Sequence, residues 1–236
     1  MSADDDDLDE TTFPAWRDAI AAHAHEAPAP RSYPGYPRWP LPHTKPGLFG
    51  GASLEKTLAA RRASGALGDE PPDVRDLGRV LELAHGITGD DARGPVPSAG
   101  GLQALEIYVA TWAPGWLAPG WYHFDRTAHA LAQVSAGATR TAVAAIVPSL
   151  ELVRGGALSW ILVGDHARVA ARYGRRALRF LTLEAGHLMQ NLCLASHAAK
   201  LCTIPLGGFF ERPLARALHV PRTDRILYAG VLGRPL

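Results

Sequence analysis

The chain has 236 residues, 47% hydrophobic and 20% charged, which fits a single domain with one sizeable core, or one domain with an arm. Its 24 basic and 23 acidic residues leave a net charge of +1, which excludes a global field that would attract nucleic acid or an anionic membrane. No window approaches the roughly 18 apolar residues of a membrane span, and the start, MSADDDDLDE, lacks the features of a secretory signal. We therefore expect a cytoplasmic protein.

Residues 1–50 are interpreted as an acidic, then proline-rich, N-terminal arm. An acidic run at 4–7 leads into a possible short helix over 13–25, and seven prolines follow between Pro28 and Pro46. A flexible linker has little use for large rings. We predict that the arm lies on a folded surface, of its own or a partner subunit, anchored by Tyr33, Tyr36, Trp39 and Phe49. A disordered leader is the alternative.

Residues 51–236 are predicted to form one domain with an α+β fold. Ser53 is a plausible N-cap for a helix over 54–62, and a second helix over 73–87 carries its apolar residues on one face. Strand patterns separated by turn residues predict a mainly antiparallel sheet, flanked by helices, over 105–111, 120–126, 130–134 and 158–165. The pattern returns to helix over 166–200, and a last strand over 225–233 closes the domain.

The stretch VPSAGGLQALEIYVAT, residues 96–111, places small residues directly before a strand. Pro97 fixes one φ angle, Ser98 adds a hydroxyl, and Gly100 and Gly101 remove two Cβ atoms. A flat or anionic ligand can therefore lie against the main-chain amides. An ordinary glycine turn entering a strand is the alternative.

From about Leu54 to the C-terminus the chain carries, in order, LAARRAS, VPSAGGLQALEIYV, PGWYHFD, ARYGRRALRFLTLEAGHLMQNLCLAS, IPLGGFF and ILYAGVLGRP. Together these segments resemble the SagB-type dehydrogenases of the nitroreductase superfamily. The resemblance implies a nitroreductase-like α+β fold that binds FMN, usually at a homodimer interface to which both subunits contribute. It also implies oxidation of peptide azolines to azoles in the maturation of ribosomally made natural products.

The resemblance also implies which residues bind FMN. Arg61 and Arg62 match an arginine-rich helix end that binds the phosphate, which requires bidentate, permanently charged donors. A solvated helix end is the alternative for these two arginines. The other implied contacts are Ser64, the loop residues Pro97, Ser98, Ala99 and Gly100, then Gln103, the turn Leu206, Gly207 and Gly208 facing flavin N5, and Arg234 as a second phosphate contact.

The chain departs from the family pattern at the arginine pair and after the glycine loop. Ala63 and Gly65 stand where the family usually has serine and arginine, with Ser64 displaced between them, so we expect reduced flavin affinity. Gln103 stands where the family usually has tyrosine, and it looks more like the corresponding loop of general nitroreductases. We therefore expect a different substrate preference.

A catalytic pair is implied at Arg172 and Tyr173, where the family has a lysine and a tyrosine proposed to move protons. Arginine is a poor base because it stays protonated. Tyr173 is therefore the expected proton-handling side chain, with positive charge supplied by Arg172, or by Arg168 or Arg176. A packed aromatic ring is the alternative for Tyr173.

His187 and Gln190 lie three residues apart in the segment EAGHLMQN and match a recurrent family motif. Small residues nearby make core packing or a dimer interface the alternative for this helix. Cys193 and Cys202 have neither zinc-type nor CxxC spacing, so we expect two buried thiols rather than a disulfide. The nearest approach to a ligand motif is His23-Ala-His25, and we expect no metal.

Three functions remain open. The first is an FMN-dependent oxidoreductase that acts on a modified peptide or peptide-like intermediate in natural-product biosynthesis. The second is a general NAD(P)H-dependent nitroreductase or flavin reductase, which Gln103 favours. The third is a flavin-poor scaffold that binds a cyclase or a peptide, which Ala63, Gly65 and Arg172 favour. Expected partners are the substrate, a second copy of the chain and, for the scaffold, a cyclase, with no nucleic acid and no membrane.

Overall fold

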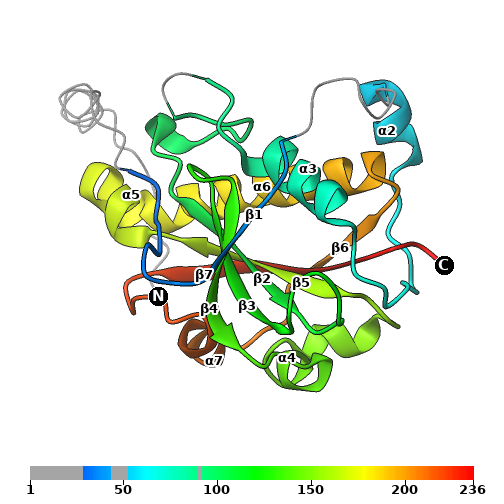
Figure 1. Cartoon of the computed structure of the whole chain (residues 1–236). Helices are drawn as coiled ribbons and strands as arrows, with labels where there is room; N and C mark the ends of the chain where they lie inside the picture. The colour runs from blue at the N-terminus through cyan, green and yellow to red at the C-terminus, as the bar shows by residue number, and fades with distance from the viewer. Residues whose placement is uncertain (1–28, 44–52, 90–91) are drawn as a thin grey trace.

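Seven strands form the central sheet in the order β1-β4-β3-β2-β5-β7-β6. The computed structural model describes residues 29–43, 53–89 and 92–236 (Figure 1). The strands are β1 (Arg38–Pro40), β2 (Leu105–Thr111), β3 (Gly120–Asp125), β4 (Ala130–Ala136), β5 (Leu158–Gly164), β6 (Cys202–Leu206) and β7 (Arg225–Gly233). Every neighbouring pair is antiparallel, so the predicted sheet type is confirmed.

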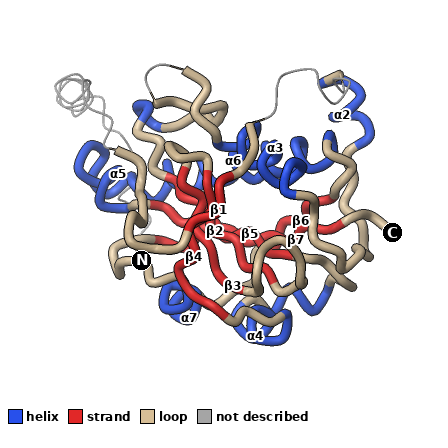
Figure 2. Tube along the Cα trace, viewed as in Figure 1, coloured by secondary structure: helices blue, strands red, loops and turns tan. Residues whose placement is uncertain are grey.

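Helices cover both faces of the sheet (Figure 2). Helices α3, α5 and α6 pack on one face, and α4 and α7 pack on the other. The helices are α2 (Leu54–Ala60), α3 (Val74–His85), α4 (Arg140–Ile146), α5 (His166–Tyr173), α6 (Ala177–Ala198) and α7 (Glu211–Ala217), with short 3-10 turns η1 (Ala99–Gly101), η2 (Pro148–Leu152) and η3 (Gly174–Arg176). The predicted α+β class is therefore confirmed.

The central strands are buried along their whole length because helices cover both of their faces. β2 reads LEIYVAT and β5 reads LSWILVG, with no exposed residue in either strand. An antiparallel sheet with one solvated face would alternate apolar and polar residues instead. One apolar layer is built around Trp160 and Leu188, and the layer on the opposite face around Ile161 and Leu214.

Polar side chains cap the N-termini of α2, α3 and α5. The Ser53 hydroxyl accepts a hydrogen bond from the Lys56 amide at 3.1 Å, which confirms the predicted N-cap of α2. Asp73 caps α3 in the same way, and Asp165 accepts from the Arg168 amide at the start of α5. Such caps satisfy amide groups that have no partner within the helix.

The chain between residues 166 and 200 is not the single helix that its pattern predicts. It breaks at Gly174, whose φ of 53° lies in the left-handed region, and this turn separates α5 from α6. The short elements β6, α4 and α7 were not predicted either. β6 contains Pro205 and pairs only with the distant strand β7, so no local alternation marks it.

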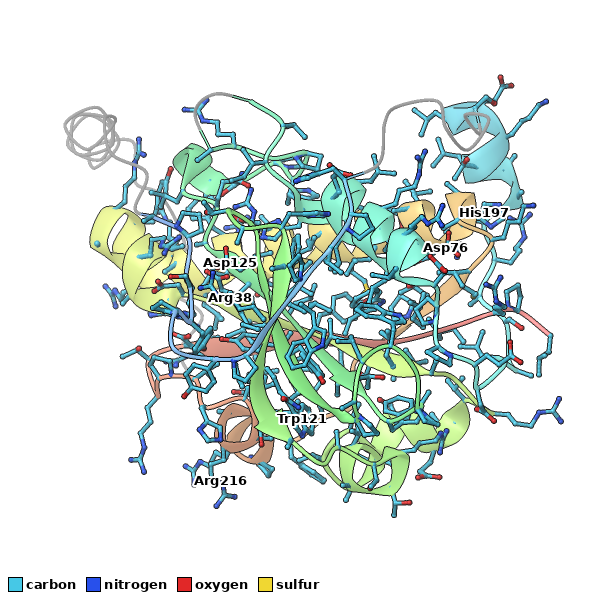
Figure 3. The ribbon with its side chains drawn as sticks, in the orientation of Figure 1. Arg38, Asp76, Trp121, Asp125, His197 and Arg216 are labelled. Carbon is cyan, nitrogen blue, oxygen red and sulfur yellow. The ribbon has the colours of Figure 1, made fainter. Side chains whose placement is uncertain are left out.

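The arm segment, which we define as residues 29–43, lies against the sheet of its own chain. β1 pairs with β4, and Trp39 packs edge-on against Tyr122 with ring centroids 5.4 Å apart. Arg38 forms an ion pair with Asp125 at 3.4 Å (Figure 3). The Tyr33 hydroxyl shares a 2.7 Å hydrogen bond with that of Tyr108. Tertiary contacts therefore hold this segment in place.

Two of the four rings expected to anchor the arm pack on the core. Tyr33 and Trp39 contact the two apolar layers, whereas Tyr36 is 42% exposed. Phe49, the acidic run and the possible helix over 13–25 lie outside the described residues. Within the described ranges, every helix is too short or too polar to span a membrane.

Candidate functional site

The Ser98 hydroxyl group links the glycine loop before β2 to helix α6. The Ser98 hydroxyl donates to Glu184 Oε2 at 2.8 Å and accepts from the Gln103 amide at 2.8 Å. Gly100 and Gly101 have φ values of 59° and 69°, so the loop turns through a conformation that favours glycine. The loop is therefore a held structure rather than a loose connection.

The groups that approach the loop backbone at Gly100 are the side chains of the predicted catalytic pair. A Cβ atom at Gly100 would lie 2.6 Å from both the Arg172 guanidinium and the Tyr173 hydroxyl. Arg172 donates to the Gly100 carbonyl at 3.2 Å, and its guanidinium carbon is 5.6 Å from the centre of the Tyr173 ring. Although they are neighbours on α5, both side chains reach the same glycine. Glycine at this position leaves room for these two side chains, and its φ of 59° also favours glycine.

A cavity of about 350 Å³ opens beside the loop. Tyr173 is only 9% exposed and packs on Phe180 with ring centroids 4.7 Å apart. His187 extends toward the loop, with Nδ1 3.4 Å from the Pro97 carbonyl. The lining combines α5, α6 and the loop: Pro97, Ser98, Ala99, Gly100, Tyr173, Phe180, Leu183, Glu184 and His187. Residues that the resemblance assigned to cofactor binding and to catalysis therefore share one cavity.

Glu184 is the titratable group in this cavity that sequence reasoning missed. It is 2% exposed, and burial raises its pKa to about 7, against the opposing effects of the Ser98 hydroxyl, backbone amides and Arg126. It lies on the buried face of α6 between Leu181 and Leu188. A single carboxylate on an apolar helical face was the signal available in the sequence.

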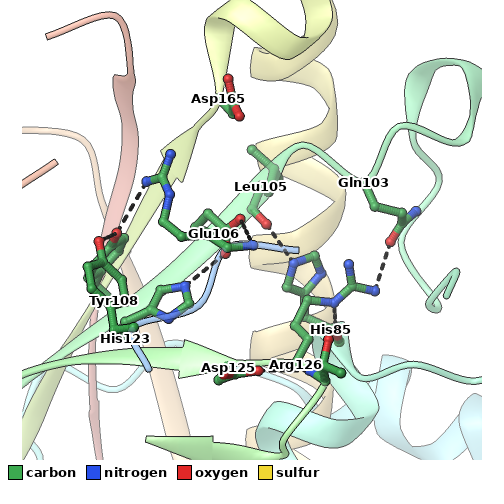
Figure 4. Close-up of polar contacts among 12 residues, drawn as sticks. His85, Gln103, Leu105, Glu106, Tyr108, His123, Asp125, Arg126 and Asp165 are labelled. Atoms are coloured by element: carbon green, nitrogen blue, oxygen red, sulfur yellow. Dashed lines mark hydrogen bonds and ion pairs between the residues drawn. The ribbon is translucent and has the colours of Figure 1, made fainter. Parts of the chain in front are cut away.

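Gln103 supports the loop from behind rather than lining the cavity. It is 8% exposed, its Nε2 donates to the Val96 carbonyl at 3.1 Å, and its Oε1 accepts from Arg126 at 3.1 Å (Figure 4). Arg126 also donates to the His85 carbonyl at 2.6 Å. Burial lowers the pKa of His85 to about 3, so this imidazole is neutral at physiological pH. These buried contacts position the loop.

The predicted phosphate-binding arginines lie at the end of α2, beside the C-terminal half of α6. Arg62 donates to the carbonyls of Ala59 and Arg61, and its own carbonyl accepts a 3.6 Å contact from Cys202. Burial raises the pKa of the Cys193 thiol to about 11, and the positive charge of Arg61 opposes this effect. Arg61 therefore lies near Cys193. Both cysteines are free and buried, as predicted.

The turn after β6 leaves open space at one glycine. No atom lies within 4 Å of the position that a Cβ would occupy at Gly207, whereas the Gly208 carbonyl accepts a 2.8 Å hydrogen bond from Ser149. Ser64 donates to the Ala66 carbonyl at 2.7 Å, and Arg234 forms a 3.9 Å ion pair with Asp76. Ser64 and Arg234 thus have intramolecular partners.

The predicted site residues fall into two groups along α6. The loop, Tyr173 and Arg172 lie near the half that carries Glu184 and His187, whereas Arg61 lies near Cys193. Glu184 and Cys193 are separated by about 13 Å along the helix axis at roughly 1.5 Å per residue. Among the described residues, no hydrogen bond or ion pair joins the two groups directly. Within one chain the predicted residues therefore lie in two separate groups, one around Tyr173 and one around Arg61.

A larger hollow of about 940 Å³ lies between α7 and the start of β7. It contains none of the predicted site residues, and its lining includes Arg212, Arg216, Arg222 and Arg225. Arg225 donates to the carbonyls of three preceding residues. We therefore locate the candidate site at the smaller cavity, where the titratable side chains converge.

Comparison with known sequences identifies a family. The model described as the nitroreductase family matches residues 58–234. A protein of Methanocaldococcus jannaschii with a provisional nitroreductase name is 26% identical over 174 residues, which cover 74% of this chain and 88% of that protein.

Solved structures share the fold. A provisionally named nitroreductase from Anabaena variabilis is 28% identical with a TM-score of 0.68, but this chain, matched over 78% of its length, spans only 38% of that one. Another from Ralstonia eutropha is 20% identical, with a TM-score of 0.72 over 89% of this chain and 94% of that one. The Escherichia coli microcin synthetase McbBCD complex with truncated pro-MccB17 bound includes a chain that is 18% identical, with a TM-score of 0.67 over 98% of this chain and 99% of that one. The predicted nitroreductase-like fold is confirmed, and the chain belongs to the nitroreductase family.

Proposed function

We propose that this chain is an FMN-dependent dehydrogenase of the SagB type, which oxidises a peptide azoline or a related intermediate to an azole in natural-product biosynthesis. The observation that carries the proposal is the convergence of the 97–100 loop, Tyr173 and Glu184 on one cavity. Similarity in fold along nearly the whole chain to part of the microcin synthetase complex supports it, because that structure contains truncated pro-MccB17.

The residues present fit an FMN molecule. Arg61 and Arg62 supply two permanently charged donors suited to a phosphate. The open space at Gly207 allows a flat ring system to approach the backbone. Ala63 and Gly65 supply no polar side chain beside the arginines, so binding rests on fewer contacts than the family pattern provides.

Two copies of the chain complete each site in this proposal. The half-site around Tyr173 and the half-site around Arg61 are held apart by α6, so a second copy would supply the missing half. Two leucines on α6 have exposed side chains: Leu183, which lines the cavity, is 53% exposed and Leu178 is 47% exposed. A dimer would cover these side chains.

Conversion of an azoline to an azole removes two hydrogens from the ring, one as a hydride and one as a proton. FMN, when bound, accepts the hydride. The chain's own contribution is to hold the ring in the cavity and to accept the proton at the Tyr173 oxygen in its phenolate form. Arg172 stays protonated and holds the Gly100 carbonyl, so it fixes the loop beside Tyr173. Glu184 is a second group in the cavity that can exchange a proton near neutral pH.

Arg61→Ala and Arg62→Ala are each expected to weaken FMN binding. A charge-assisted hydrogen bond contributes roughly 1.5–3 kcal/mol, which corresponds to a tenfold to hundredfold change in affinity. Titration of the protein with FMN, followed by flavin fluorescence and by the visible spectrum, measures the change. Arg216→Ala, on the exposed surface of α7, is the matched control and should bind FMN as the wild type does. Unchanged affinity in both variants would reject the phosphate role, and a wild-type protein that FMN cannot reconstitute would favour the scaffold hypothesis.

The protein is expected to sediment as a homodimer, with about twice the 25.2 kDa mass of one chain. Leu183→Arg places a charge on the exposed apolar part of α6 and should shift the mass toward one chain, with loss of FMN affinity because each site loses half of its residues. Analytical ultracentrifugation with and without FMN measures both effects. A monomer that binds FMN with undiminished affinity would contradict the shared site.

A general nitroreductase is the second candidate, because the curated relative from Methanocaldococcus jannaschii carries that provisional name. In a general nitroreductase NAD(P)H would reduce the flavin and a nitro compound would oxidise it, whereas in an azoline dehydrogenase the peptide substrate would reduce it. Steady-state oxidation of NADPH with a nitroaromatic acceptor, compared with oxidation of a thiazoline-containing peptide, separates them. Rapid NADPH turnover with no peptide oxidation would favour the general nitroreductase.

A further inference from the structure

Three potential metal ligands from distant parts of the chain meet at one edge of the molecule. His43 ends the arm segment, Glu82 lies on α3, and His129 lies in the hairpin between β3 and β4. One ligand atom from each side chain lies within 4.8 Å of those of the other two. The closest pair is His43 Nδ1 and Glu82 Oε1 at 2.9 Å, and the two imidazole rings stack with centroids 4.3 Å apart.

The backbone holds these side chains together without help from a ligand. The Leu41 amide donates to the His129 carbonyl at 2.9 Å, which fixes the arm segment to the hairpin two residues before His43. Gly78 on α3 allows the close approach, because a Cβ atom there would lie 3.1 Å from the Pro42 carbonyl and 3.6 Å from His129 Nε2. The geometry is thus set by three independent elements of the fold.

His129 gives the strongest indication that this cluster binds a ligand. It is only 4% exposed, and its Nε2 makes no hydrogen bond within the described part of the chain. A buried polar atom without a partner is costly, unlike one bonded to a metal.

None of these three residues belongs to the proposed FMN phosphate contacts or to the cavity beside the glycine loop. Two imidazoles and one carboxylate form a donor set that suits Zn²⁺, which binds nitrogen and oxygen at about 2.0–2.2 Å in tetrahedral geometry. Such bonds place ligand atoms roughly 3.3 Å apart, so a separation at the 4.8 Å limit must shorten by about 1.5 Å. His43 is exposed and can supply this movement by rotating its side chain. A water molecule can take the fourth position on the exposed side.

We propose that His43, Glu82 and His129 form a zinc site that ties the arm segment to α3 and to the β3–β4 hairpin. This departs from the expectation, based on sequence spacing, that the protein binds no metal. No spacing motif marks the site, because its ligands come from three separate segments. The proposal does not depend on the proposed oxidoreductase function.

The experiment titrates metal-free full-length protein with ZnCl₂ against a chromophoric chelator. The wild type is expected to bind one equivalent of Zn²⁺, and His43→Gln, Glu82→Gln and His129→Asn should each weaken binding by at least about tenfold, because loss of even an outer contact costs a metal site that much. His129 has a φ of 44°, and asparagine tolerates that conformation, so His129→Asn should fold. The matched control is His219→Asn, an exposed histidine with a φ of 54° that lies outside the cluster.

A second control separates the cluster from the histidines of the arm's first half. The double variant His23→Gln, His25→Gln should bind Zn²⁺ as the wild type does. Hydrogen exchange at the Leu41 amide, which is bonded to His129, should slow at least about tenfold when Zn²⁺ is added, because the metal closes the contact that this amide must open to exchange. The proposal fails if the wild type binds no Zn²⁺, if the three cluster variants bind it undiminished, or if only the double variant loses it.

Discussion

Tyr173→Phe is expected to retain FMN near the wild-type content and to lose substrate oxidation by at least about tenfold, in line with the roughly 10²–10⁴ typical of general acid–base groups. The substitution keeps the ring that packs on Phe180 and removes only the hydroxyl beside Gly100. Single-turnover oxidation of a thiazoline-containing peptide by the FMN-loaded protein, followed by flavin absorbance, measures the change.

The matched control for this variant is Tyr36→Phe, which also removes one phenolic hydroxyl but lies exposed on the arm segment. It should oxidise the peptide at the wild-type rate. Wild-type turnover by Tyr173→Phe would assign Tyr173 to packing and would leave Glu184 as the remaining acid–base candidate in the cavity. A parallel loss of FMN in Tyr173→Phe would show that the hydroxyl acts on cofactor binding instead.

Glu184→Gln is expected to change how the free energy of unfolding depends on pH. Burial raises the pKa of Glu184 from 4.5 to about 7 in the folded protein. Above pH 4.5 the unfolded chain releases this proton while the folded chain retains it, so the stabilisation present at low pH is lost progressively as pH rises to 7. Between pH 5 and 8 the wild type should lose roughly 2–3 kcal/mol of stability through this group, and the variant should not.

Urea unfolding at pH 5 and pH 8, for the wild type and Glu184→Gln, gives the difference directly. Glutamine keeps an oxygen that can accept the Ser98 hydrogen bond, so the loop contact survives at both pH values. Glu55→Gln, an exposed residue of α2, is the control and should follow the wild type. The same pH profile in Glu184→Gln as in the wild type would mean that Glu184 is ionised in the folded protein throughout this range.

The parts of the fold that could be predicted from the sequence are those with strong local patterns. The apolar runs of β2 and β5 and the capping side chain of Ser53 mark their elements within a few residues. β6 could not be predicted this way, because Pro205 interrupts it and its only partner strand lies beyond α7. The break at Gly174 was missed because a single glycine does not by itself end a helical pattern.

The site shows the same limit. Small residues around Gly100 indicate that something approaches the backbone closely, but which groups do so depends on how α5 packs on the loop. The role of Gln103 also depends on packing, because a residue directly after a glycine loop can face either side of it. The cluster of His43, Glu82 and His129 has no local signal at all, since it exists only after the sheet brings the arm segment beside α3.

Both edge strands of the described sheet contain a proline, Pro40 in β1 and Pro205 in β6. A proline has no amide hydrogen to offer to a further strand, and β1 is only three residues long. A short edge at β1 and a proline in the edge strand β6 both disfavour binding of a peptide by strand addition. Recognition of the proposed peptide substrate would then favour side chains and loops, which tolerate varied backbone shapes such as those that heterocycles impose.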